Sequence, residues 1–151
     1  MDKLALKNEI TKDPNVLGYG SLLEKGNDVG IAALLNAPDP ATLVSVEALR
    51  RDVKMLLISL GKLPAILAAT DAVSLTAKYL LSDPDFATFD TTDARTQALM
   101  AGLKAEGLLT DADIKALTSL SQRPGSRAEV LWGVGSRIPH QVVAAAFGRG
   151  E

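Results

Sequence analysis

Apolar residues recur every three or four positions along most of the chain, which is the spacing of an amphipathic helix. The longest such pattern covers residues 45–60, where charged side chains fall mostly on the opposite face. Ser45 can cap the start of this segment, and Gly61 can end it. We therefore expect a helix at the centre of the core. Its apolar stripe consists of Val46, Leu49, Val53, Leu56 and Leu60.

Prolines, glycines and capping residues divide the rest of the chain into short helical segments. The pair Asp13-Pro14 ends a first helix, because the residue before a proline disfavours helical dihedral angles. Thr110 with Asp113, and Ser126 with Glu129, have the spacing of a capping box. Helical signals therefore cover residues 3–11, 28–36, 45–60, 63–69, 71–81, 93–105, 111–121, 126–132 and 139–147.

The connecting segments have the composition of turns and loops. We expect turns at Gly18–Gly20 and Arg123–Gly125, and an acidic loop over residues 82–92. No segment shows the sustained alternation of a half-buried strand. The prediction is an all-α fold: one compact domain over residues 1–151 with about seven short helices.

Composition limits the core and the chemistry of the chain. The 151 residues are 47% hydrophobic but only 4% aromatic, so the core must consist mainly of Leu, Val, Ile and Ala. The absence of cysteine excludes disulfides and cysteine-ligated metals. We expect no membrane span, because no run of about 18 apolar residues is present. The first residues also lack the apolar stretch of a signal peptide.

Charge and local pattern give little support to nucleic-acid binding. The net charge is −2, although residues 121–151 carry four arginines and two acidic residues. Residues 111–132 loosely resemble a helix-turn-helix. However, the second helix of that segment offers Val130, Leu131 and Trp132 where base-reading polar side chains are needed. We interpret this segment as packing, and expect no nucleic-acid partner.

No catalytic or cofactor-binding motif is complete. Ser59 and Lys62 match a Ser-x-x-Lys pattern at a helix end, but its partner motifs are absent. Gly133 and Gly135 lack the third glycine of a dinucleotide-binding loop. His140 is the single histidine, and we interpret it as an exposed or capping residue. The sequence therefore predicts a protein that is not an enzyme and has no cofactor.

The acidic loop is the one segment that suggests a metal. Four aspartates fall between residues 83 and 93, but a calcium loop starting at Asp83 needs glycine at 88 and glutamate at 94. Those positions hold Thr88 and Ala94. We attribute the aspartates to turn formation and helix starts, and predict no metal site.

Short sequence motifs at both ends resemble a known group of proteins. The chain has Leu-Lys-x-Glu-Ile at 6–10, Asp-Pro at 13–14, Gly-Tyr at 18–19 and Leu-Asn ending a helix at 35–36. Ser-Arg-Ala-Glu follows at 126–129. These motifs resemble small proteins encoded by tailed bacteriophages and prophages. The middle of the chain contributes nothing distinctive to this resemblance.

The resemblance implies a virion protein and supplies no catalytic residues. We expect a non-enzymatic structural or adaptor protein of the head–tail or tail region, made in the host cytoplasm and then located in the virion. Its partners would be other virion proteins and copies of itself. The alternative is a phage regulatory or counter-defence protein that binds a host protein or nucleic acid.

The polar ends of the chain are the expected contact regions. Tyrosine, tryptophan and arginine are enriched at interface hot spots, and both ends contain them. Alternatively, Tyr19, Trp132 and Phe147 only seal the core of an aromatic-poor protein. The predicted partner-binding residues are Tyr19, Arg123, Arg127, Trp132 and Arg137.

Overall fold

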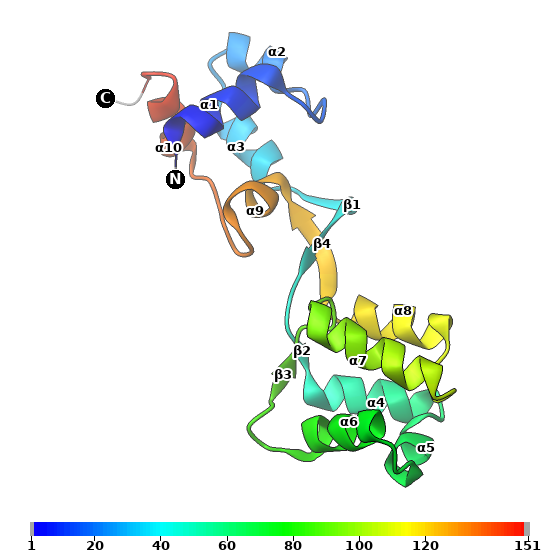
Figure 1. Cartoon of the computed structure of the whole chain (residues 1–151). Helices are drawn as coiled ribbons and strands as arrows, with labels where there is room; N and C mark the ends of the chain where they lie inside the picture. Colours follow the sequence, from blue (N-terminus) through cyan, green and yellow to red (C-terminus); the bar gives the residue numbers. More distant parts are fainter. Residues whose placement is uncertain (1, 150–151) are drawn as a thin grey trace. The chain divides into compact units, whose positions relative to one another are not determined.

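A computed structural model describes residues 2–149, which are mostly helical (Figure 1). Within this range the helices are α1 (Lys3–Lys12), α2 (Tyr19–Glu24), α3 (Asp28–Asn36), α4 (Arg50–Ser59), α5 (Leu63–Ala68), α6 (Ala72–Ser82), α7 (Ala94–Ala105), α8 (Asp111–Ser119), α9 (Arg127–Trp132) and α10 (His140–Ala146). The strands are β1 (Pro38–Ser45), β2 (Ala48–Leu49), β3 (Thr88–Phe89) and β4 (Gln122–Ser126). The expected mostly helical fold is confirmed, but residues 2–149 form ten helices rather than about seven, and the short strands mean that the fold is not purely α.

The chain forms two compact units where the sequence predicted one domain over residues 1–151. Unit 1 combines the segment up to Val44 with the segment from Pro124 onward. Unit 2 is the continuous segment Ser45–Arg123. The periodicity of a helix shows which of its faces is apolar, but not which other helix covers that face. The sequence pattern therefore could not reveal that the apolar faces gather in two places.

The short strands were missed because their pairing is not local. β2 pairs antiparallel with β3, with Ala48 opposite Phe89 and Leu49 opposite Thr88. β1 and β4 form a second two-stranded sheet, so the expectation of a turn at Arg123–Gly125 is wrong: these residues lie in β4. Prolines occur in both β1 and β4, and a two-stranded sheet tolerates them because each strand keeps one unpaired edge. The close approach of these two strands requires Gly125, since a Cβ atom there would overlap the side chain of Val44.

The helix boundaries agree with those expected from the sequence except at two places, the turn at Gly18–Gly20 and the start of the segment 45–60. Both predicted capping boxes are present, at Thr110–Asp113 and Ser126–Glu129. The expected turn at Gly18–Gly20 instead leads directly into α2, which begins at Tyr19. The segment 45–60 becomes helical only at Arg50, because the residues before it bond to distant backbone groups. For example, the Val46 amide donates to the Ser121 carbonyl at 2.9 Å.

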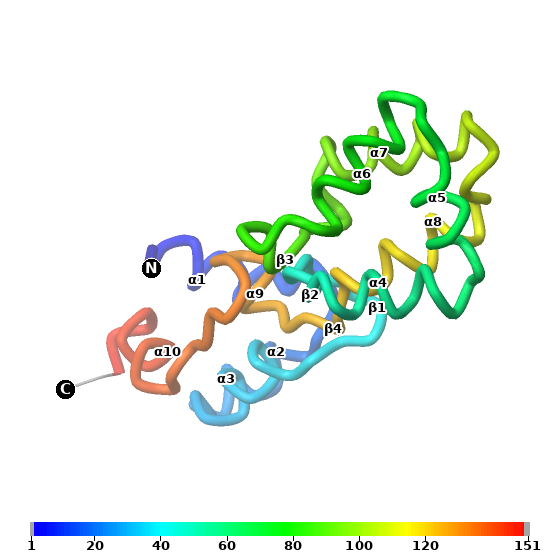
Figure 2. The backbone as a smooth tube through the Cα atoms, turned by 90° about the horizontal axis from the view of Figure 1, so that it is seen from below, coloured from blue at the N-terminus to red at the C-terminus, as the bar shows by residue number. Residues whose placement is uncertain are grey.

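Unit 2 is built from α4 to α8, which group together in both views (Figure 1 and Figure 2). Val53 and Leu57 of α4 are buried, and Leu56 packs partly against the same core. Leu49 of the expected stripe is instead 45% exposed. The buried cluster consists of Ala48, Val53, Leu57, Leu63, Ile66, Ala77, Leu81, Met100, Leu103, Leu109 and Leu117.

Unit 1 joins the two ends of the chain. Helix α3 packs against α2, α9 and α10, and α1 packs against α2 and α10. The N-terminal and C-terminal helices therefore lie side by side (Figure 1) and contribute to one core. Its buried residues are Leu6, Ile10, Tyr19, Ile31, Ala32, Leu35, Ala128, Ile138 and Val143.

Candidate functional site

Tyr19, expected at the surface as a contact residue, is completely buried in unit 1. Its hydroxyl has no hydrogen-bond partner among the described residues. Burial raises the pKa of this phenol above its ordinary value, and the charges of Glu9 and Asp13 add to the rise, whereas Arg127 opposes it. The expectation of an exposed Tyr19 is therefore wrong, because the first turn of α2 directs the ring into the core. The alternative, that this ring seals the core, describes the structure.

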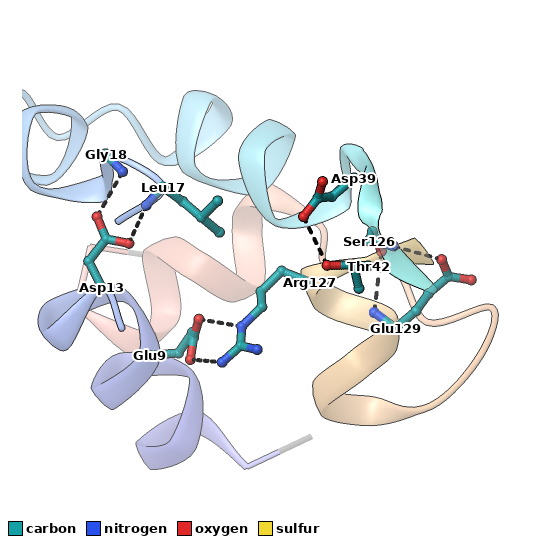
Figure 3. A network of polar contacts seen from close by, with 9 residues as sticks. All are labelled: Glu9, Asp13, Leu17, Gly18, Asp39, Thr42, Ser126, Arg127 and Glu129. Carbon is teal, nitrogen blue, oxygen red and sulfur yellow. Dashed lines mark hydrogen bonds and ion pairs between the residues drawn. The ribbon is translucent and has the colours of Figure 1, made fainter. Parts of the chain in front are cut away.

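Arg127 is also engaged inside unit 1. Its Nε lies 2.6 Å from Glu9 Oε1, and its Nη2 lies 2.9 Å from Glu9 Oε2 (Figure 3). The two side chains are only 19% and 7% exposed. The hydrogen bonds that Arg127 donates to Glu9 raise the pKa of Arg127, although burial acts in the opposite direction. This arginine joins α9 to α1, which leaves its charge little available to a partner.

The turn between α1 and α2 is ordered by Asp13. Its carboxylate accepts hydrogen bonds from the amides of Leu17 and Gly18, both at 2.7 Å, and from the Tyr19 amide at 3.1 Å. Figure 3 shows the first two of these bonds. Asp13 itself adopts a left-handed conformation with φ 39°, which aspartate tolerates better than most residues. The hydrogen bonds to Asp13 therefore account for the order of this turn, and no partner protein is needed to explain it.

The remaining predicted contact residues do not meet at one surface. Trp132 and Phe147 are partly buried against the unit 1 core. Arg137 is exposed, while Arg123 is half-buried in β4 and belongs to the other unit. The structure thus places Tyr19, Arg127 and Trp132 in unit 1, at or against its core, and not together on a surface.

The sequence candidates for chemistry are not arranged as a site. The Ser59 hydroxyl donates to the Leu56 carbonyl of its own helix at 2.8 Å, and Lys62 pairs with Asp113 at 3.3 Å. His140 is exposed at the start of α10. Among residues 2–149, no group of three or more acidic or histidine side chains could hold a metal ion. None of the helices in this range has the length and apolar character needed to cross a membrane.

Unit 2 contains a small interior cavity of about 70 Å³. It lies among core side chains such as Leu57, Ile66, Met100 and Leu103, and its lining is almost wholly apolar. Typical ligand sites in proteins enclose about 300–1,000 Å³. We therefore regard this cavity as a gap in core packing.

The open face of α4 carries a larger hollow, of about 450 Å³, which we call the α4 groove. Arg51, Met55 and Ile58 follow one another at helical spacing, so they lie on one face of α4. That face is turned away from the buried Val53 and Leu57. The α4 groove is lined by Leu49, Arg50, Arg51, Lys54, Met55, Ile58 and Ala87.

The apolar part of the α4 groove is exposed to an unusual degree. Leu49 is 45% exposed, Met55 59% and Ile58 51%, although each is a large apolar side chain. Sequence reasoning missed this surface because it treated the outer face of residues 45–60 as charged. The available signal was that Met55 and Ile58 interrupt that charged face.

The rim of the α4 groove is cationic. Arg50 donates to the Asp83 carbonyl, and Arg51 pairs with Asp52 at 3.2 Å. Lys54 makes no hydrogen bond or ion pair through its side chain with any described residue. The seven lining residues include three cations and no acidic residue. The groove can therefore contact apolar and anionic groups at the same time.

Comparison with known proteins identifies no relative of this chain. No family model matches the chain, and neither a curated protein nor a solved structure is similar to it. The significance of the α4 groove must therefore be argued from its own residues.

Proposed function

We propose that this protein is a non-enzymatic adaptor that acts through protein–protein contacts, with the α4 groove as a contact surface. The observation that carries this proposal is the exposure of Leu49, Met55 and Ile58 in a single hollow. Contiguous exposed apolar side chains with a polar rim are typical of interaction sites. Covering them would remove apolar area from water, which stabilises a complex by about 25 cal/mol per Å².

The proposed setting is the virion of a tailed phage, at the head–tail or tail region. The support for this setting is the resemblance of residues 6–10, 13–14, 18–19 and 126–129 to small phage and prophage proteins. In that setting the partners are other virion proteins and further copies of this chain. Repeated subunits in such particles offer several equivalent contact sites.

Incorporation into particles tests the proposal. The double variant Met55→Ser/Ile58→Ser removes most of the exposed apolar surface of the groove without changing the buried face of α4. We expect its incorporation into purified virions, measured by quantitative mass spectrometry, to fall about tenfold, which corresponds to roughly 1.4 kcal/mol of lost contact energy. Its melting temperature should stay close to that of the unmodified protein.

The matched control is Leu75→Ser, which removes an equally exposed leucine (53%) from α6, outside the groove. This variant should be incorporated normally. Normal incorporation of the Met55→Ser/Ile58→Ser protein would contradict a contact role for the groove. Absence of the unmodified protein from purified particles, combined with synthesis early in infection, would favour the regulatory or counter-defence alternative.

A further inference from the structure

The charge of the α4 groove indicates what it binds, an inference that rests on the proposed adaptor function. We propose that the groove binds an acidic segment of a partner protein, and that this segment also carries apolar side chains. Three observations support the proposal: the sign of the rim, the aliphatic floor and the length of the groove.

The rim is positive on a chain that is negative overall. Arg50, Arg51 and Lys54 line the groove without an acidic residue among them, whereas the whole chain has a net charge of −2. The local excess of cations is therefore not a consequence of a generally basic protein. Complementary charge at an interface speeds association and selects the partner.

The neighbouring acidic residues compensate this charge only in part. Asp52 pairs with Arg51, and Glu47 accepts a hydrogen bond from the Thr88 hydroxyl at 2.7 Å. Neither acidic residue lines the groove. Lys54 has no anionic partner within the described residues, so an added carboxylate would gain a charge-assisted contact there.

The floor favours a protein segment over a nucleic acid. It consists of Leu49, Met55, Ile58 and Ala87, and none of the lining residues is aromatic. Proteins that bind single-stranded nucleic acid stack its bases on aromatic side chains. Methionine, by contrast, is flexible and adapts to the apolar side chains of a bound peptide.

The dimensions fit a short segment. From Arg51 to Ile58 the helix rises about 10 Å, which is two turns. A bound segment of similar length can present two or three apolar side chains to the floor and acidic side chains to the rim. This is the recognition pattern of an amphipathic segment in a groove.

Two synthetic peptides test the proposal on the full chain. Both are fluorescein-labelled helical peptides with leucines at positions i, i+3, i+4 and i+7; one has glutamate at the other positions, and the second has lysine. Fluorescence anisotropy should show that the glutamate peptide binds at least about tenfold more tightly, a difference that added salt reduces. A labelled oligo-dT of similar length serves as the nucleic-acid probe and should bind more weakly than the glutamate peptide.

Variants then locate the effect. Arg51→Glu/Lys54→Glu should reverse the preference toward the lysine peptide, and Met55→Ser/Ile58→Ser should weaken binding of both peptides about tenfold. Lys115→Glu changes an exposed lysine of α8 outside the groove and should leave the preference unchanged.

Several results would overturn the inference. They are equal binding of the two peptides, unchanged preference in Arg51→Glu/Lys54→Glu, and tighter binding of oligo-dT. Self-association of the unmodified chain that this charge reversal abolishes would identify a second copy as the occupant. Failure of the adaptor function is a separate result, because normal virion incorporation of Met55→Ser/Ile58→Ser contradicts that function whichever peptide binds.

Discussion

Arg127 holds both carboxylate oxygens of Glu9, a residue 118 positions earlier in the chain. The contact links α9 to α1, so it connects the N-terminal and C-terminal segments that together form unit 1. Because the pair is mostly buried, each charge depends on the other for compensation. Removing one partner leaves the other charge buried without a counter-charge.

We therefore expect Arg127→Ala to destabilise unit 1 by about 3 kcal/mol. Guanidinium denaturation followed by the fluorescence of Trp132, the single tryptophan, measures this change. The control is Arg137→Ala, which removes an exposed arginine and should change stability by less than about 0.5 kcal/mol. Equal effects of the two substitutions would mean that the Glu9–Arg127 pair contributes nothing specific.

The buried hydroxyl of Tyr19 predicts a loss of stability at alkaline pH. Burial raises the pKa of Tyr19, so the folded phenol keeps its proton when the unfolded one ionises above about pH 10. The unfolded state then binds fewer protons, and the free energy of unfolding falls as pH rises from 10 toward the folded pKa. Below pH 10 the phenol is protonated in both the folded and the unfolded state, so the protein keeps the full stability that it loses at higher pH.

Tyr19→Phe should remove that part of the pH dependence, which denaturation at pH 8 and pH 11 can measure. At pH 8 the variant should be at least as stable as the unmodified protein, because the hydroxyl has no hydrogen-bond partner to lose. Lysines also titrate in this range, so the informative quantity is the difference between the two proteins. An identical loss of stability in both would refute the role of Tyr19.

The contact between β1 and β4 depends on the missing side chain of Gly125. Gly125→Ala should destabilise the protein by about 1–3 kcal/mol, since its Cβ would overlap Val44. Adding Val44→Ala should recover part of this loss, although Val44→Ala alone is destabilising. Gly20→Ala is the control, because nothing lies within 4 Å of its added Cβ and its position is helical. Strict additivity of the two substitutions would argue against the overlap.

The two faces of α4 should respond differently to the same substitution. Val53→Asp places a charge in the core of unit 2 and should cost several kcal/mol, enough to unfold the unit. Met55→Asp, two positions away, changes an exposed residue and should leave the melting curve nearly unchanged. Circular dichroism during thermal denaturation compares the two variants. Similar melting curves would show that α4 does not bury the Val53 face.

Local signals in the sequence were sufficient for most helices. The capping boxes at Thr110–Asp113 and Ser126–Glu129, and the N-cap at Asp71, are formed by groups only three residues apart. Hydrogen bonds between residues three positions apart depend on the local sequence and not on the tertiary structure. The sequence alone therefore indicated a mostly helical protein and located its principal helix boundaries.

Tertiary structure decided the features that depend on distant pairs. The hydrogen bond from Val46 to Ser121, the pairing of Ala48 with Phe89 and the contact of Arg127 with Glu9 join residues separated by tens of positions. No spacing rule connects such residues, because each contact requires the intervening chain to be folded. For the same reason, only the folded chain showed that Tyr19 is buried, while Met55 and Ile58 remain open to solvent on the far side of the helix that buries Val53.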